Sequence, residues 1–230
     1  MKWIEDYQLF LFDFDGLLVN TEELHYRAYQ RMLQQRGYHL SWSFRRYCLA
    51  AHHGATQLRR ELYAEFPELH QREPEWEVLY SEKKEQFCQL VSEKAVELIP
   101  GVEAMLRCLG NTGVERCVVT NSPQDVVDMI REQLPLLATI PHWITRYDYT
   151  HPKPHPECYE TAIDKFAKAD DRIIGFEDTV RGLRALQATR ALPVLICHPE
   201  VDWLEDVKEE GVSHYKSFLD IPDEGPYPLG

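Results

Sequence analysis

The stretch Leu9-Phe10-Leu11-Phe12-Asp13-Phe14-Asp15-Gly16 decides how this chain folds. Its four apolar residues are typical of a short strand buried on both faces, and the Asp-Phe-Asp-Gly that follows ends the strand at a turn. Similar apolar runs recur at 116–120, 142–145, 172–176 and 192–196. Segments with helical spacing separate these runs, and strands that alternate with helices form parallel βαβ units. The sequence therefore predicts an α/β fold built on a parallel sheet.

The segment after the first strand has a different pattern. Between about Asn20 and Val96 there is no convincing strand, and apolar residues recur at three- and four-residue intervals. Helices are predicted near 21–36, 55–65 and 73–94, with Gly37, Gly54 and Pro67 as breaks. We therefore predict a helical domain over residues 20–96, inserted into an α/β core that contains residues 1–19 and 97–230.

Two further predictions concern the ends of segments. Ser122 suits the N-cap of a helix whose first residue is Pro123, because proline is favoured at the first helical position. The tail from Pro222 to Gly230 is rich in proline and glycine, so we expect it to be loosely held.

Composition excludes several classes of protein. The 230 residues are 44% hydrophobic and 27% charged, as in an ordinary globular protein of one or two domains. A formal net charge of −13 repels nucleic acid and anionic membranes, so neither is an expected partner. The start, Met1-Lys2-Trp3-Ile4-Glu5-Asp6, is acidic where a signal peptide is basic, and the six scattered cysteines form no Cys-x-x-Cys pair. We expect reduced thiols and a cytoplasmic location.

Polar residues follow the predicted strands. They are Asp13 and Asp15 after the first strand, Thr120, Asn121 and Ser122 after the second, Lys153 near the third, and Glu177 and Asp178 after the fourth. In an open parallel sheet, ligands bind outside the carboxyl ends of the strands, so these side chains are expected to share one crevice. Four carboxylates in one pocket need a cation, and oxygen ligands without sulfur or histidine favour Mg²⁺.

This set of residues suits phosphoryl transfer. Asp13 is a candidate nucleophile toward phosphorus, and Asp15 a candidate acid and base for the leaving oxygen and for water. Lys153 and Thr120 would hold the transferring phosphoryl group. Each motif alone has a plainer explanation, such as a turn, a helix cap or a solvated loop. Their joint occurrence at successive strand ends favours the catalytic interpretation.

The same motifs resemble the haloacid dehalogenase superfamily of phosphotransferases. Four stretches match its motifs in order: Phe12–Glu22, Val119–Ser122, Lys153–Pro156 and Gly175–Gly182. The helical insertion is similar to the cap of the β-phosphoglucomutase-like branch. The resemblance implies a Rossmann-like core, a helical cap domain after the first strand, Mg²⁺ as cofactor and an aspartyl-phosphate intermediate.

The resemblance also implies roles for individual residues. Asp13 becomes the nucleophile and a metal ligand, and Asp15 the general acid and base, with a backbone carbonyl that also binds the metal. Glu177 and Asp178 complete the metal site, and Lys153 joins the catalytic residues. Substrate contacts are expected from Gly16, His25, Thr120 and Asn121. His25 matches a histidine at the cap hinge, whereas its helical position alone would make it an exposed histidine.

Departures from the branch bear on the substrate. The loop position that carries a phosphate-gripping arginine in the mutases is Gln57 here, and an ungapped count places their cap lysine near Cys88. If the helix register differs from this count, Lys83, Lys84, Arg59 or Arg60 could take the place of that lysine. We therefore predict a Mg²⁺-dependent phosphatase that acts on a small phosphorylated metabolite, such as a sugar phosphate or a similar monoester. The alternatives are a β-phosphoglucomutase-like mutase and a non-catalytic binding or regulatory protein; the sequence carries no signal of oligomeric state.

Overall fold

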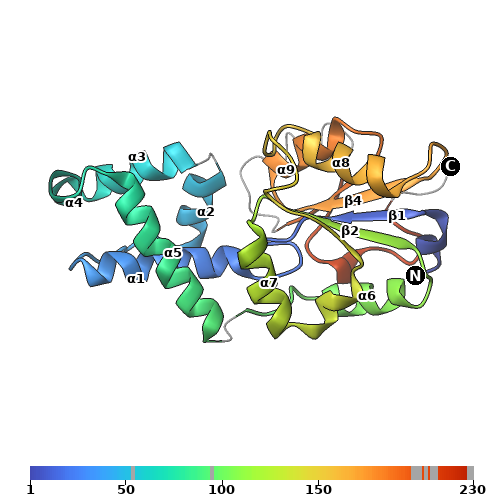
Figure 1. Ribbon diagram of the computed structural model, residues 1–230, viewed down its shortest axis with the longest axis horizontal. Helices are drawn as coiled ribbons and strands as arrows, with labels where there is room; N and C mark the ends of the chain where they lie inside the picture. Colours follow the sequence, from blue (N-terminus) through green and yellow to red (C-terminus); the bar gives the residue numbers. More distant parts are fainter. Residues whose placement is uncertain (53–54, 94–95, 198–203, 205–206, 208–211, 227–230) are drawn as a thin grey trace. The chain divides into compact units, whose positions relative to one another are not determined.

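The chain divides into two compact units. The computed structural model describes residues 1–52, 55–93, 96–197, 204, 207 and 212–226. One unit contains Met1–Asn20 and Glu97–Gly230, and the other contains Thr21–Val96 (Figure 1). The first unit holds the sheet and the second is helical, so each is described by itself below.

The first unit is built on a parallel sheet. Its described strands are β1 (Leu9–Phe12), β2 (Glu115–Val119), β3 (His142–Ile144), β4 (Ile173–Glu177), β5 (Leu192–Ile196) and β6 (Ser213–Tyr215). They lie in the order β3-β2-β1-β4-β5-β6, and every neighbouring pair is parallel. The predicted α/β fold with a parallel, Rossmann-like sheet is confirmed. The strand β6 was not predicted, because Ser-His-Tyr contains no apolar run.

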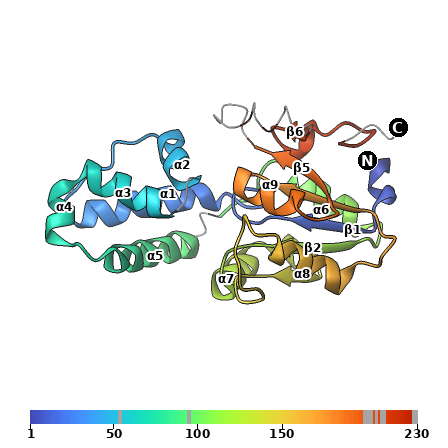
Figure 2. The same ribbon diagram turned by 90° about the horizontal axis from the view of Figure 1, so that it is seen from above.

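Helices cover both faces of this sheet (Figures 1 and 2). The helices α8 (Glu157–Phe166) and α9 (Val180–Gln187) lie on one face, and α6 (Val102–Gly110) and α7 (Gln124–Gln133) lie on the other. Short 3-10 helices span Lys2–Asp6, Pro135–Thr139 and Phe218–Asp220. Successive side chains of a strand point to opposite faces. Accordingly Leu9 and Leu11 belong to the apolar cluster that also contains Ile163 of α8 and Leu186 of α9.

Aromatic rings fill the opposite face of β1 and β4. The ring of Phe176 stacks on those of Phe12 and Phe10, with centroids 5.3 Å and 6.4 Å apart. Trp3 and Phe218, from the first and last 3-10 helices, pack against Phe176 at 6.5 Å and 5.3 Å. All five side chains are buried. The first and last of the described 3-10 helices therefore pack against the strands that carry the acidic motifs.

The second unit is formed by helices within its described residues. They are α1 (Thr21–Gln35), α2 (Phe44–His52), α3 (Ala55–Glu65), α4 (Pro67–Arg72) and α5 (Trp76–Ser92). The helices α1 and α5 make the most extensive contact. Pro67 is the first residue of α4 rather than a break, because a proline at this position loses no intrahelical hydrogen bond. None of the described helices has the length and apolar composition needed to cross a bilayer.

The two segments that lead to and from the helical unit are hydrogen-bonded to each other. The amide N of Asn20 donates to the carbonyl O of Glu97 (3.1 Å), and Ile99 N donates to Leu18 O (3.0 Å). The side chain of Asn20 accepts from the Glu97 amide at 2.8 Å. The exit and return of the chain are thus fixed in one place at the edge of the first unit.

Two predictions about segment ends were wrong in part. The helix α7 begins at Gln124, with Pro123 at the N-cap, because Ser122 donates its hydroxyl hydrogen bond to Asp15 instead of capping a helix. In the tail, residues 227–230 lie outside the described residues, but Pro226 is buried. Its carbonyl O accepts hydrogen bonds from Ser213 (2.7 Å) and Tyr215 (2.8 Å), so the tail is held against β6 at Pro226.

We expect the substitution Phe10→Ala to lower the free energy of unfolding by about 3–5 kcal/mol, because it leaves a cavity among buried rings. Tyr147→Ala is the matched control: its side chain is 73% exposed, so the change is expected to stay within about 0.5 kcal/mol. Urea unfolding followed by circular dichroism measures both. Equal effects of the two substitutions would contradict the assignment of this aromatic core.

Candidate active site

Three carboxylates converge where the strand order reverses. Asp13 directly follows β1, and its amide N donates to the carbonyl O of Phe176 on β4 (3.0 Å). Glu177 is the last residue of β4, and Asp178 follows it. One carboxylate oxygen from each of these three residues lies within 4.8 Å of the others. The predicted group of acids therefore lies at the carboxyl ends of β1 and β4, the topological switch point where open α/β sheets bind ligands.

The ammonium group of Lys153 lies between two of these acids. Its Nζ atom donates to Asp13 Oδ1 at 2.6 Å and to Glu177 Oε1 at 2.7 Å. It also donates to the carbonyl O of Val119 at 2.8 Å. The Lys153 side chain is only 4% exposed, so water contributes little to its solvation. The loop between β3 and α8 thus delivers a buried cation to the predicted nucleophile.

The charges in this site do not balance. Burial raises the pKa of Asp13 to about 8; Glu177 and Asp15 act in the same direction, and Lys153 opposes them. Burial by itself lowers the pKa of Lys153, but the carboxylates of Asp13 and Glu177 outweigh it and raise this pKa. The single positive charge of Lys153 can neutralise only one of the carboxylates next to it. An additional cation would therefore favour the ionised form of the carboxyl groups.

The three carboxylates fit a hard divalent cation. They offer oxygen donors only, from two adjacent strand ends, and Asp13 and Glu177 are buried. This donor chemistry suits Mg²⁺ or Ca²⁺ rather than a softer metal. The side chain of Asp15 is outside this three-carboxylate group, and the predicted contact of its backbone carbonyl with a metal stays a prediction.

Asp15 is held by two hydroxyl groups from the end of β2. Thr120 Oγ1 donates to Asp15 Oδ2 at 3.0 Å, and Ser122 Oγ donates to the same oxygen at 2.6 Å. Gly16 follows with φ = 86°, a left-handed conformation that favours glycine. The structure thus brings Asp15 and Thr120 together as predicted. Ser122, also expected among these strand-end residues, bonds to Asp15 through the hydroxyl that the sequence assigned to a helix cap.

Asn121 is oriented by a tyrosine that the sequence did not single out. The hydroxyl of Tyr149 lies 2.6 Å from Asn121 Oδ1 and 2.9 Å from the carbonyl O of Thr120, and both atoms accept from it. The amide N of Lys153 also donates to Asn121 Oδ1, at 3.4 Å. Tyr149 therefore links the end of β2 to the loop that carries Lys153.

Two further residues support Glu177. The hydroxyl of Tyr159 donates to Glu177 Oε1 at 2.5 Å and lies 3.0 Å from Lys153 Nζ. Gly182, in the first turn of α9, approaches so closely that a Cβ atom there would lie 2.0 Å from Glu177 Oε2. Gly182 lies within a motif that the sequence comparison used. Tyr159 gave no signal, because a tyrosine on an amphipathic helix looks like an ordinary core residue.

The helical unit contains a histidine–lysine pair. Lys83 Nζ lies 2.8 Å from His25 Nδ1, and the His25 ring stacks on Phe87 with centroids 4.1 Å apart. Burial, with a contribution from Lys83, holds the pKa of His25 well below its usual range, so the imidazole is neutral and its Nδ1 accepts. His25 is half-buried rather than an exposed histidine. Lys83 is one of the four residues named above as alternatives to Cys88 for the cap lysine, and its ammonium contacts His25.

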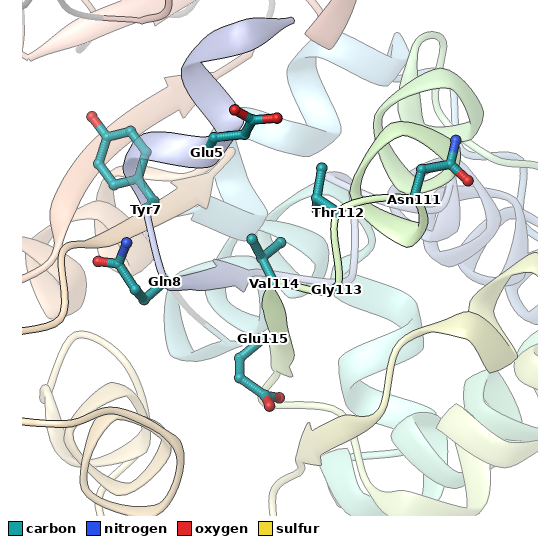
Figure 3. A pocket seen from close by; sticks show the side chains of 8 residues that line it. All are labelled: Glu5, Tyr7, Gln8, Asn111, Thr112, Gly113, Val114 and Glu115. Carbon is teal, nitrogen blue, oxygen red and sulfur yellow. The ribbon is translucent and has the colours of Figure 1, made fainter.

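A hollow elsewhere on the first unit contains none of the predicted site residues. Figure 3 shows it at the amino ends of β1 and β2, lined by Glu5, Tyr7, Gln8, Asn111, Thr112, Gly113, Val114 and Glu115. Its volume is about 520 Å³. Because Gln8 and Val114 precede their strands, this hollow lies at the edge of the sheet opposite to Asp13. It is not the candidate active site.

Comparison with known proteins identifies the family. The family model described as "Haloacid dehalogenase-like hydrolase" matches residues 10–192. The chain belongs to this family. It is 26% identical to "Probable pseudouridine-5'-phosphatase" of Drosophila melanogaster, over 91% of this chain and 87% of that protein. It is 24% identical to "Phosphorylated carbohydrates phosphatase" of Thermotoga maritima, over 77% of this chain and 79% of that protein.

Solved structures show the same fold. A β-phosphoglucomutase from Clostridium difficile aligns with a TM-score of 0.68 at 17% identity, over 95% of this chain and 94% of that one. The predicted resemblance to the haloacid dehalogenase superfamily is confirmed by the family model, and the fold is shared with this β-phosphoglucomutase. The predicted enzyme class, a phosphoric monoester hydrolase of this family, agrees with the names of the relatives.

We expect Gly182→Ala to reduce activity at least tenfold and to lower stability by about 1–3 kcal/mol, because the new methyl group displaces the Glu177 carboxylate. Gly110→Ala is the matched control, since a Cβ atom there meets its nearest neighbour, Arg116 Nη1, at an ordinary 3.6 Å. Phosphate release and urea unfolding measure the two effects. Wild-type activity of the Gly182→Ala variant would show that the position of Glu177 does not matter.

Proposed function

We propose that the protein is a Mg²⁺-dependent phosphatase that hydrolyses a small phosphorylated metabolite through an aspartyl-phosphate on Asp13. One observation carries this proposal: a buried carboxylate, Asp13, lies at the end of β1 with the Lys153 ammonium 2.6 Å from its Oδ1 atom. A carboxylate at a ligand-binding strand end, next to a fixed cation, is suited to attack a phosphoryl group that the same cation attracts.

In the first step a carboxylate oxygen of Asp13 attacks phosphorus, and the bond between phosphorus and the ester oxygen breaks. Asp15, two residues further along, gives its proton to the departing oxygen, so the product leaves as an alcohol. The hydroxyl groups of Thr120 and Ser122, both within 3.0 Å of Asp15 Oδ2, fix the direction of this carboxyl group. Lys153 binds an oxygen of the transferring phosphoryl group as negative charge moves onto it.

In the second step water attacks the phosphorus of the aspartyl-phosphate. Asp15, now a carboxylate, takes a proton from this water, and the bond between phosphorus and Asp13 breaks. Inorganic phosphate leaves, and both aspartates return to their starting state. Asp15 thus alternates between acid and base, while Asp13 carries the covalent link.

The metal would be held by Asp13, Glu177 and Asp178, whose oxygen donors converge. Mg²⁺, when bound, would neutralise carboxylate charge and bind a phosphate oxygen. The family resemblance adds the backbone carbonyl of Asp15 to this set.

The helical unit is proposed to act as the cap that selects the substrate. Its Gln57 donates to Glu61 Oε1 at 2.5 Å, so the position that carries a phosphate-gripping arginine in the mutases is a neutral side chain bonded within its own helix. This supports hydrolysis of a monoester over a mutase reaction, which needs a second phosphate site. The names of the two relatives support a sugar phosphate or a nucleoside 5'-phosphate as substrate. A cytoplasmic location stays a prediction.

The proposal is tested by phosphate release from a panel of sugar phosphates and nucleoside monophosphates, with Mg²⁺ and with chelator. Asp13→Asn is expected to lower kcat/KM by about 10³-fold or more, because it removes the nucleophile. Asp164→Asn, on the exposed face of α8, is the matched control and is expected to keep full activity. Activity that survives in Asp13→Asn, or that does not need Mg²⁺, would overturn the mechanism.

The variant Asp15→Asn separates the two steps. It is expected to slow turnover and to accumulate enzyme that carries one additional phosphoryl group, which intact-protein mass spectrometry detects. Conversion of a hexose 1-phosphate to the 6-phosphate, without net phosphate release, would instead identify a mutase. Silence in both assays would favour the non-catalytic alternative.

A further inference from the structure

We propose that the loop before α8 carries a second metal site, formed by His151, His155 and Glu157, which binds a borderline divalent cation of the Zn²⁺ class. One ligand atom from each of these residues lies within 4.8 Å of the others. None of the three belongs to the proposed catalytic centre. This site is independent of the proposed function, because its ligands differ in kind from the carboxylate oxygens around Asp13.

The donor set selects the class of metal. Two imidazoles and one carboxylate suit Zn²⁺, Co²⁺, Ni²⁺ or Cu²⁺, whereas Mg²⁺ prefers oxygen ligands. The same combination of two histidines and one acid holds zinc in sites that keep an open position for water. The cation expected here is therefore distinct from that of the three-carboxylate centre.

The separations between donor atoms fit such a cation. Metal–ligand distances of about 2.0–2.1 Å in a tetrahedral site place neighbouring donors about 3.3 Å apart. Glu157 Oε2 lies 2.6 Å from His151 Nδ1 and 4.0 Å from His155 Nδ1, so the two observed distances bracket that value. Nδ1 of His155 accepts from the amide N of Glu157 at 3.2 Å, so this imidazole would exchange that bond for the metal, and the metal would take the place of the proton on His151 Nδ1.

The carboxylate is held in place by the backbone. Glu157 Oε1 accepts from the amide N of Thr150 (2.8 Å), and Oε2 accepts from the amide N of His151 (2.9 Å). These two backbone bonds restrict the orientation of the carboxylate next to His151. Hydrogen bonds that orient a ligating carboxylate are a regular feature of metal sites.

The loop is stiff and open to solvent. Proline occupies positions 152, 154 and 156, between the proposed ligands, and each proline restricts the backbone. The side chains of His151 and His155 are 63% and 51% exposed, so a cation reaches them directly from water. Their rings are already close, with centroids 4.7 Å apart. Little conformational freedom is lost when the metal binds.

Metal binding at this site would affect the loop that carries Lys153. His151 and Glu157 flank Lys153, whose ammonium contacts Asp13. A cation held by residues 151, 155 and 157 would cross-link the backbone on the two sides of Lys153. Its binding is therefore expected to stabilise the segment that delivers the catalytic lysine.

The test is equilibrium dialysis of the full chain against Zn²⁺ in the presence of excess Mg²⁺, which occupies the carboxylate centre. One equivalent of Zn²⁺ is expected to bind. His151→Ala and His155→Ala should each weaken binding at least tenfold, since each removes one of three ligands. His142→Ala is the matched control: its Nε2 atom pairs with Glu115 at 2.8 Å, but among the described residues it belongs to neither group of three potential ligands, so Zn²⁺ binding should be unchanged.

Two readouts separate this site from other metal-binding groups. Asp178→Asn should retain the bound Zn²⁺, whereas loss of Zn²⁺ in that variant would place it at the carboxylate centre. Bound Co²⁺ should show visible absorption without a sulfur-to-metal charge-transfer band, because no cysteine takes part. Zn²⁺ should also raise Tm in the His142→Ala variant but not in His155→Ala. Unchanged binding in the two histidine variants, or no binding to the wild type, would overturn the proposal.

Discussion

The candidate active site depends on the hydrogen bonds and ion pairs of the buried Lys153 ammonium. This ammonium bonds to Asp13 after β1, to the carbonyl O of Val119 at the end of β2, and to Glu177 at the end of β4. One side chain therefore ties together the ends of three neighbouring strands. Removing one partner of such a buried ion pair leaves a charge without compensation, which typically costs about 3–5 kcal/mol. The charge arrangement that we propose for phosphoryl transfer is thus also a constraint on folding.

The residues around this ion pair fix its geometry. Tyr159 bonds to Glu177, and Gly182 leaves room for the Glu177 carboxylate against α9. Thr179 caps α9 by accepting from the Gly182 amide at 3.1 Å, which places Glu177 and Asp178 beside the positive end of the helix dipole. Groups that are oriented before the substrate arrives stabilise a transition state without the cost of reorganisation. The supporting residues are therefore part of the catalytic design.

The sequence predicted the parts of this arrangement that follow from strand ends. Asp13, Lys153 and Glu177 were found because the carboxyl ends of parallel strands share one edge of the sheet. Tyr159 was not, because no pattern distinguishes a tyrosine that bonds to a buried acid from one that only fills the core. The count that places the mutases' cap lysine near Cys88 stays a prediction, because the register of a lysine on α5 depends on the loops and short helices α2 and α4, which periodicity does not resolve.

The overall charge and the local charge of the protein act over different distances. At physiological ionic strength, exposed charges are largely screened beyond about 8 Å. A single phosphoryl group bound next to Lys153 would therefore be attracted mainly by that ammonium, and affected only weakly by the surface acids that give a net charge of −13. A long polyanion extends over several such lengths and meets the acidic surface directly. An acidic protein with a buried cation at its strand ends is consequently better suited to the small monoesters proposed as its substrates than to a long polyanion.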